Sequence, residues 1–202
     1  MRKLGIDFYQ RSNVLQIAKE LLGKILVTKW GGIETSGRIV EVEAYNGIID
    51  KASHASGGRR TSRNEVMYGK GGVAYVYLCY GIHHLFNVVT NEQETPHAIL
   101  IRALEPLKGI DTMLERTNKK QPDNTLTRGP GNVSKALGIS FKHHSGHSLL
   151  SRDLFIAEDD FVLNKKDVAL SPRIGVDYAG EDASLPYRFY IKGNPFVSGK
   201  PK

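Results

Sequence analysis

The segment RIVEVEAY, residues 38–45, places two carboxylates in an otherwise apolar stretch. At the period of two of a β-strand, one face of this segment carries Ile39, Glu41, Glu43 and Tyr45. The opposite face holds small apolar side chains and is the expected core face. One interpretation leaves both carboxylates in solvent. The other puts a carboxylate in a cleft as a general base, with the tyrosine lining the same wall.

Three tyrosines, Tyr75, Tyr77 and Tyr80, stand close together in VAYVYLCYGIHHLFNVV, residues 73–89. The alternation of aromatic and aliphatic residues, followed by Gly81, predicts a β-hairpin. In one interpretation these tyrosines only pack the hairpin. In the other, at least one of them stacks on a flat aromatic group that comes from outside the protein.

The segment HASGGRRTSRN combines His54 with Arg59, Arg60 and Arg63 on a loop that contains two glycines. Such a loop can simply be a solvated basic surface. Alternatively, its arginines and backbone amides can bind the phosphates of a nucleic-acid backbone without reading its sequence. Both interpretations are open at this point.

A metal site is suggested by HHSGH, in which His143 and His147 have helical spacing. However, Gly146 lies between them, and no Cys, Asp or Glu nearby completes a ligand set. We therefore predict no metal. The glycines of GKGGVAY match neither a P-loop nor a dinucleotide fingerprint, so no cofactor is expected.

The 202 residues include 28 Lys and Arg against 21 Asp and Glu, a formal net charge of +7. This excess favours a polyanionic partner, either nucleic acid or an acidic membrane surface. Cys79 is the only cysteine, which excludes an intrachain disulfide and favours a reducing compartment. No segment approaches the ~18 apolar residues of a transmembrane helix, and no targeting segment is evident. We expect a soluble, cytoplasmic protein that does not enter a membrane.

Local patterns predict the elements that must position these residues. Apolar spacing predicts helices at residues 13–22, 109–117 and 131–140, the first with Ser12 or Asn13 as its cap. Strands are expected at residues 24–30, 37–45, 73–79, 84–90 and 97–107. The first two should form a hairpin that turns at Gly31 and Gly32, and Pro106 should end the last. The polar residues 118–130 should form a mobile surface loop, and the remainder short strands and turns. No repeat or linker divides the chain, so we expect one compact α+β domain built on antiparallel strands.

Five segments follow one another along the chain: GRIVEVEAY, SHASGGRRTSRNEVMYGKGGVAYVYLCYGIHHLFNVV, AILIRALEPL, RGPGNVSKALGI and PRIGVDYAG…LPYRFYIKGNPFVS. Together they resemble the alkyladenine (3-methyladenine) DNA glycosylase family over roughly residues 10–198. The resemblance implies a single α+β domain over residues 1–202, with a curved antiparallel sheet, a protruding β-hairpin and flanking helices. It also implies a fold similar to the C-terminal domain of formyltransferases.

The resemblance assigns the chemistry to a few residues. Glu43 matches the general base that activates a water molecule, and Arg102, in LIRALEP, matches the arginine that helps to hold this water. The main-chain carbonyl of Ile174 matches a further contact to the water. Glu41 is then structural or electrostatic. No lysine occupies a nucleophile position, which implies a monofunctional enzyme that leaves an uncut abasic site.

The resemblance also assigns a pocket for the base that is flipped out of the duplex. Tyr45 and Tyr77 match the aromatic walls on either side of this base. His54 matches the histidine that hydrogen-bonds the base at the end of the pocket. Asn87 matches the asparagine whose side chain crowds the exocyclic amino group of guanine. An aromatic pocket attracts bases that alkylation at N3 or N7 has made cationic.

Contacts to the rest of the DNA are implied as well. Tyr80, at the glycine turn, matches the tyrosine that fills the gap left in the duplex, where stacking returns ~1–3 kcal/mol. Arg59, Arg60 and Arg63 are expected to contact backbone phosphates. Tyr75 has no counterpart in the family pattern and is predicted to pack.

We therefore expect a monomeric DNA glycosylase of base excision repair that needs no cofactor and works at the nucleoid in the cytoplasm. Its partner would be double-stranded DNA that contains damaged purines: 3-methyladenine, 7-methylguanine, hypoxanthine and ethenoadenine. Two departures from the family pattern stand out. Asn46 and residues 48–49 differ from it beside the pocket, and Asn132 replaces a usual lysine.

Two other functions are open. A non-catalytic nucleic-acid-binding module could have this fold, although the presence of both Glu43 and Arg102 speaks against it. A His-dependent metallohydrolase could use HHSGH, and full activity in a chelator would exclude it.

Overall fold

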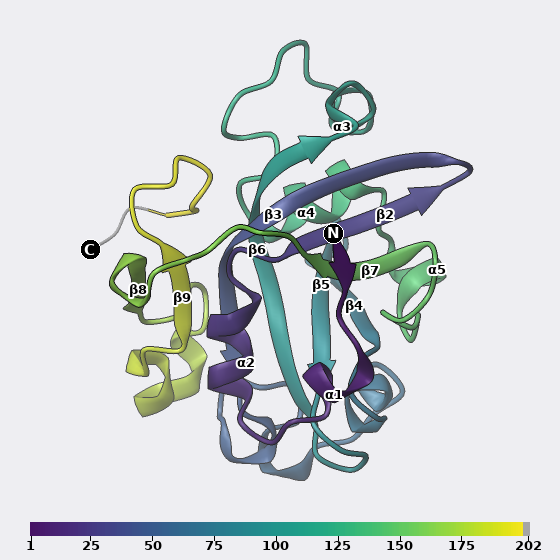
Figure 1. Ribbon diagram of the computed structural model, residues 1–202. Helices are drawn as coiled ribbons and strands as arrows, with labels where there is room; N and C mark the ends of the chain where they lie inside the picture. Colours follow the sequence, from purple (N-terminus) through teal and green to yellow (C-terminus); the bar gives the residue numbers. More distant parts are fainter. Residues whose placement is uncertain (200–202) are drawn as a thin grey trace.

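The computed structural model describes residues 1–199, which form a nine-stranded sheet with short helices around it (Figure 1). The strand order is β1-β7-β2-β3-β6-β5-β4, with β9 added to β3 and β8 to β9. Every pair of strands is antiparallel. The strands are β1 (Arg2–Lys3), β2 (Ile25–Trp30), β3 (Ile33–Tyr45), β4 (Ala74–Cys79), β5 (His83–Thr90), β6 (His97–Lys108), β7 (Leu154–Glu158), β8 (Val168–Ser171) and β9 (Arg188–Ile191). The α+β class predicted from the sequence is confirmed.

The α-helices are short: α1 (Ile6–Tyr9), α2 (Val14–Leu21), α3 (Ile110–Thr117), α4 (Pro130–Leu137) and α5 (Phe141–His144). Helix α2 begins where predicted, because the Asn13 side chain accepts a hydrogen bond of 3.0 Å from the Gln16 N–H. Its apolar side chains pack on one face of the sheet, in the same core cluster as Ile39, Val42 and Ala44. Among the described helices, none is long and apolar enough to cross a membrane.

The pairing of β3 with β6 is irregular at the centre of the sheet. The ladder skips Val40 on β3 and Arg102 on β6, and each extra residue changes which side chains share a face. Ile39 therefore packs in the main core with Val42 and Ala44. The prediction that Ile39 shares the face of the two glutamates is wrong, because strict alternation assumes a ladder without bulges.

Strand β6 also continues beyond the predicted stop at Pro106 and ends at Lys108. Pro106 pairs with Gly37 next to a register shift in β3. Proline is tolerated at such an irregularity, where the ladder does not need its missing N–H. Gly37 is required there, since a Cβ atom would lie 2.9 Å from the Leu104 Cβ and 3.0 Å from the Glu105 carbonyl oxygen.

The β4–β5 hairpin, predicted from the tyrosine-rich segment, ends in a tight turn. The Ile82 N–H donates to the Cys79 carbonyl (3.1 Å). Tyr80 and Gly81, between them, both have positive φ (50° and 73°), as in type I′ hairpin turns. The Tyr80 side chain is 92% exposed. The tip of the hairpin therefore presents an aromatic ring to solvent.

Residues 118–129, between α3 and α4, contain no regular element apart from an isolated bridge between Arg128 and Ala103. The predicted irregular loop is confirmed in its conformation except at Pro130, where α4 begins. Its mobility stays a prediction.

Candidate active site

Glu43 lies at the centre of the face opposite α2, and neither it nor Glu41 has any exposed surface. The interpretation of this face as solvated is therefore wrong. One carboxylate oxygen of Glu43 accepts hydrogen bonds from the Ile174 N–H (2.7 Å) and lies 3.3 Å from a guanidinium nitrogen of Arg102. The other accepts from the Tyr45 hydroxyl (2.9 Å). These donors hold the carboxylate in one orientation, as a general base requires.

Arg102 supplies the positive charge beside this carboxylate. Burial works against its charged form, but Coulombic attraction by Glu43 and Glu41 outweighs burial and raises the pKa of the guanidinium. The bulge that skips Arg102 in the ladder places it beside both glutamates. In this position one buried arginine partly compensates the negative charge of both glutamates.

Behind Glu43, a second set of polar groups surrounds Glu41. Its carboxylate accepts hydrogen bonds from Arg102 Nε (2.9 Å), Arg188 Nε (2.7 Å), and the Ser198 N–H (2.6 Å) and Oγ (2.8 Å). Sequence reasoning missed Arg188 and Ser198. Both lie about 150 residues from Glu41 along the chain, where no local pattern connects them.

An aromatic cavity lies next to Glu43. Tyr45 joins the two, because it lines the cavity and its hydroxyl donates to the Glu43 carboxylate. The cavity is lined by Tyr45, Ala52, His54, Met67, Tyr75, Tyr77, Asn87, Ala98 and Tyr178. The cavity therefore contains all four pocket residues that the resemblance assigned, Tyr45, His54, Tyr77 and Asn87. Tyr75 and Tyr178 were missed. The signal for Tyr75 was its spacing of two residues from Tyr77, which puts both rings on one strand face (centroids 5.6 Å apart).

His54 closes one side of this cavity. Its Nδ1 atom is 2.8 Å from the Tyr75 hydroxyl, so Tyr75 orients the imidazole in addition to packing. Burial, and then the charges of Arg63 and Arg59, lower the pKa of His54 to about 4. The ring is therefore neutral at neutral pH, and its Nε2 atom is the nitrogen that remains for a ligand.

The other walls are fixed by hydrogen bonds. The Asn87 amide donates to the Tyr75 carbonyl (3.1 Å) and the Leu85 carbonyl (3.3 Å), which sets its orientation. Burial, and then the charge of Glu43, raise the pKa of Tyr45, so its hydroxyl stays protonated as a donor. Tyr178 lies at the border of the cavity, where its hydroxyl donates to the Ala52 carbonyl (3.0 Å).

The basic loop borders the aromatic cavity. Lys51, Arg59 and Arg63 line a neighbouring hollow of about 480 Å³ together with four hydroxyl side chains. This hollow shares His54 and Tyr178 with the aromatic cavity. Arg60 is arranged differently, because it forms ion pairs with Glu65 and Glu94 (2.6 Å each).

Two histidines of HHSGH, His144 and His147, make local structural contacts. The His144 ring lies against Trp30 (centroids 4.3 Å apart), and His147 Nε2 is 3.0 Å from the Ser151 hydroxyl. Within residues 1–199, no group of three or more His, Cys, Asp and Glu side chains could hold a metal ion.

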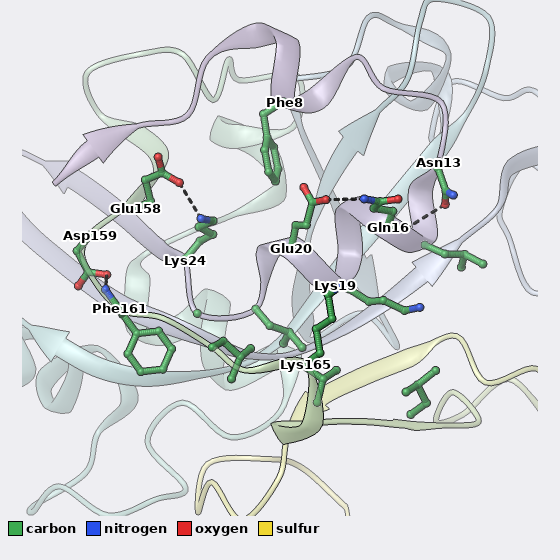
Figure 2. A pocket seen from close by; sticks show the side chains of 16 residues that line it. Phe8, Asn13, Gln16, Lys19, Glu20, Lys24, Glu158, Asp159, Phe161 and Lys165 are labelled. Carbon is green, nitrogen blue, oxygen red and sulfur yellow. Dashed lines mark hydrogen bonds and ion pairs between the residues drawn. The ribbon is translucent and has the colours of Figure 1, made fainter.

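A larger cavity lies elsewhere, beside α2 (Figure 2). This groove of about 930 Å³ is lined by α2, Phe8 and residues 158–170. Its acidic side chains, Glu20, Glu158 and Asp159, form ion pairs at 2.6–2.7 Å with neighbouring basic groups. Because α2 covers the sheet face opposite Glu43, the groove is separate from the buried glutamates.

The fold and the site together define a class of protein. A buried, oriented carboxylate beside an aromatic cavity with a cationic border is suited to hydrolysis at a flat aromatic group carried by a polyanion. Nucleic-acid bases are such groups.

Comparison with known proteins identifies the family. The family model for Methylpurine-DNA glycosylase (MPG) matches residues 7–195. A protein of Bacillus cereus (strain G9842), named as a 3-methyladenine DNA glycosylase, is 50% identical to this chain. The aligned region covers 96% of this chain and 98% of the length of that protein. A protein of the same name from Chlamydia abortus (strain DSM 27085 / S26/3) is 48% identical over 92% of this chain and 96% of its own. The chain belongs to the methylpurine-DNA glycosylase family. It is a DNA repair enzyme that hydrolyses N-glycosyl bonds in DNA.

Proposed function

We propose that this enzyme flips damaged purines out of duplex DNA and hydrolyses their N-glycosidic bond with a water molecule activated by Glu43. The observation that carries this proposal is the fully buried Glu43 carboxylate next to the aromatic cavity. Glu43 would accept a proton from the water while the water oxygen attacks C1′ of the sugar. The C1′–N bond breaks as the new C1′–O bond forms, and the base departs with the electron pair of the broken bond. An abasic site remains, and the strand is not cut.

Arg102 and Ile174 would position the water. Arg102 lies beside Glu43, and the Ile174 N–H already donates to that carboxylate. The proposed contact from the water to the Ile174 carbonyl would use the other side of the same residue. Oriented groups around the attacking oxygen lower the entropic part of the barrier.

Substrate selection would take place in the aromatic cavity. Tyr45 and Tyr77 would stack on the base, and His54 would hydrogen-bond its edge through Nε2. Asn87, with its amide orientation fixed, would obstruct the exocyclic amino group of guanine. Electron-rich rings favour cationic 3-methyladenine and 7-methylguanine. Hypoxanthine and ethenoadenine are neutral and would need protonation to leave.

Tyr80 would fill the space that the flipped nucleotide vacates, while Arg59 and Arg63 would bind phosphates next to it. Arg60 is a weaker candidate for a phosphate contact, because two carboxylates already neutralise it. We further propose that residues 1–202 form one domain that acts as a monomer in the cytoplasm, with the predicted likeness to the C-terminal domain of formyltransferases.

The test is incubation with duplexes that carry 3-methyladenine, 7-methylguanine, hypoxanthine or ethenoadenine, scored for free base. We expect release of at least the cationic lesions, with the strand intact until alkali cleaves it. Binding without release would favour the non-catalytic module. Loss of release in a chelator would favour the metallohydrolase.

A further inference from the structure

We propose that Glu41, held by Ser198 from the C-terminal segment, is a positioning residue for Arg102 and through it for the attacking water. This inference rests on the proposed function of Glu43. It assigns a role to the second buried carboxylate, which the reaction itself does not use.

The first observation is the sharing of Arg102 between the two glutamates. Arg102 Nε donates to Glu41 (2.9 Å), whereas a different nitrogen of the same guanidinium lies 3.3 Å from Glu43. The guanidinium is planar and rigid. Fixing its Nε end on Glu41 therefore fixes where the opposite nitrogens point.

The second observation concerns Ser198. Its N–H and hydroxyl both donate to Glu41 (2.6 and 2.8 Å), and its hydroxyl accepts from Arg102 (3.2 Å). Arg188 donates both to Glu41 (2.7 Å) and to the Ser198 carbonyl. Ser198 thus contacts the Glu41 carboxylate and both arginines, so the C-terminal segment completes the hydrogen-bond network around Glu41.

Charge balance explains why the network stays ordered. Two arginines, Arg102 and Arg188, face two carboxylates, Glu41 and Glu43, and all four are nearly or fully buried. A balanced buried cluster avoids the large cost of an unpaired charge. Removal of the Glu41 charge would leave both arginines to compete for Glu43, which would draw Arg102 out of position.

Three variants separate positioning from simple stabilisation. Ser198→Ala removes the hydroxyl contacts to Glu41 and Arg102, and Ser198→Thr keeps them. Ser171→Ala is the matched control, because the Ser171 hydroxyl accepts from Arg188 (3.0 Å) at the edge of the same cluster. Ser171 has no hydrogen bond to Glu41 or Arg102 in the described part of the chain.

The measurements are single-turnover release of 7-methylguanine from duplex DNA, affinity for a duplex with an abasic site, and thermal unfolding. For Ser198→Ala we expect release to slow on the order of 10-fold at unchanged affinity, because displacement of a positioning group by a fraction of an ångström slows the chemical step. Ser198→Thr should restore most of the rate. Ser171→Ala should release the base at the wild-type rate, whatever its melting temperature.

Equal rates for Ser198→Ala and Ser171→Ala, or a loss confined to affinity, would overturn the inference while leaving the proposed function intact. Failure of the wild-type protein to release any base would overturn both. Glu41→Gln gives a stronger version of the test, with an expected loss on the order of 100-fold in the folded variant.

Discussion

The surroundings of Glu43 and the tip of the β4–β5 hairpin differ in almost every physical property. Glu43 has no exposed surface and is held by Tyr45 on the same strand and by Arg102 and Ile174 from distant parts of the chain. Tyr80 is 92% exposed, at a turn with positive φ. The buried region suits chemistry, which needs fixed groups in a low dielectric. The exposed tip suits entry into another molecule, which needs a ring that stands clear of the protein.

From this difference we predict that substitutions of buried residues slow the chemical step, whereas substitutions of exposed residues weaken the interaction with DNA. The largest effect is expected for Glu43→Gln, which should slow base release at least about 1,000-fold, since a neutral amide cannot accept the proton of the water. Binding to duplex with an abasic site should be nearly unchanged. Single-turnover release and a binding titration measure the two quantities. The control is Glu34→Gln, at the partly exposed start of the same strand. Near-normal release by Glu43→Gln would remove Glu43 from the mechanism.

His54 lines the aromatic cavity beside the buried region and should make stability depend on pH. Its pKa is about 4 in the folded protein against an ordinary value of 6.5, so the unfolded chain binds more protons between these values. The free energy of unfolding should therefore fall by about 2–3 kcal/mol from this group as pH drops from 6.5 to 4. Its contribution is complete above pH 6.5. Denaturant titrations of the wild type and His54→Gln across this range would show it. Parallel pH profiles for both proteins would contradict the prediction.

At the exposed tip, Tyr80→Ser should lower the flipping equilibrium by roughly 10–100-fold, the scale of one base stack. Its melting temperature should hardly change, since the side chain buries little surface. Fluorescence of ethenoadenine in duplex DNA reports flipping, and thermal unfolding reports stability. Ile33→Ser, at the exposed end of the β2–β3 hairpin, is the matched control. Normal flipping with a clearly destabilised protein would show that Tyr80 only packs the turn.

The smallest effects are expected in the basic loop. Arg59→Ala and Arg63→Ala should each reduce the log–log salt slope of duplex binding by about 0.9, the contribution of one phosphate contact. Arg60→Ala should change the slope much less, because Glu65 and Glu94 already pair with this arginine. Binding measured between low and moderate salt gives the slopes. Equal slopes for all three variants would mean that the ion pairs open when DNA binds.

Much of the fold could be predicted because its signals are local. The cap of α2, the two hairpins and helices α3 and α4 follow from turn residues and periodicity within a few positions. The predictions failed at the bulges of β3 and β6, where Ile39 changed face and Pro106 did not end the strand. A bulge depends on both strands of a pair, so neither strand's pattern reveals it alone.

The sequence by itself determined the family, the antiparallel α+β class and four residues that line the aromatic cavity, because these rest on collinear motifs and on short-range periodicity. Only the tertiary structure decided that Glu41 and Glu43 are buried, and that Arg188 and Ser198 reach Glu41 from the far end of the chain. It also decided that Arg60 is occupied by ion pairs whereas Arg59 and Arg63 line a hollow. The reason is physical. Burial and charge pairing depend on distances in space, and the folded arrangement of segments that are far apart in the sequence defines these distances.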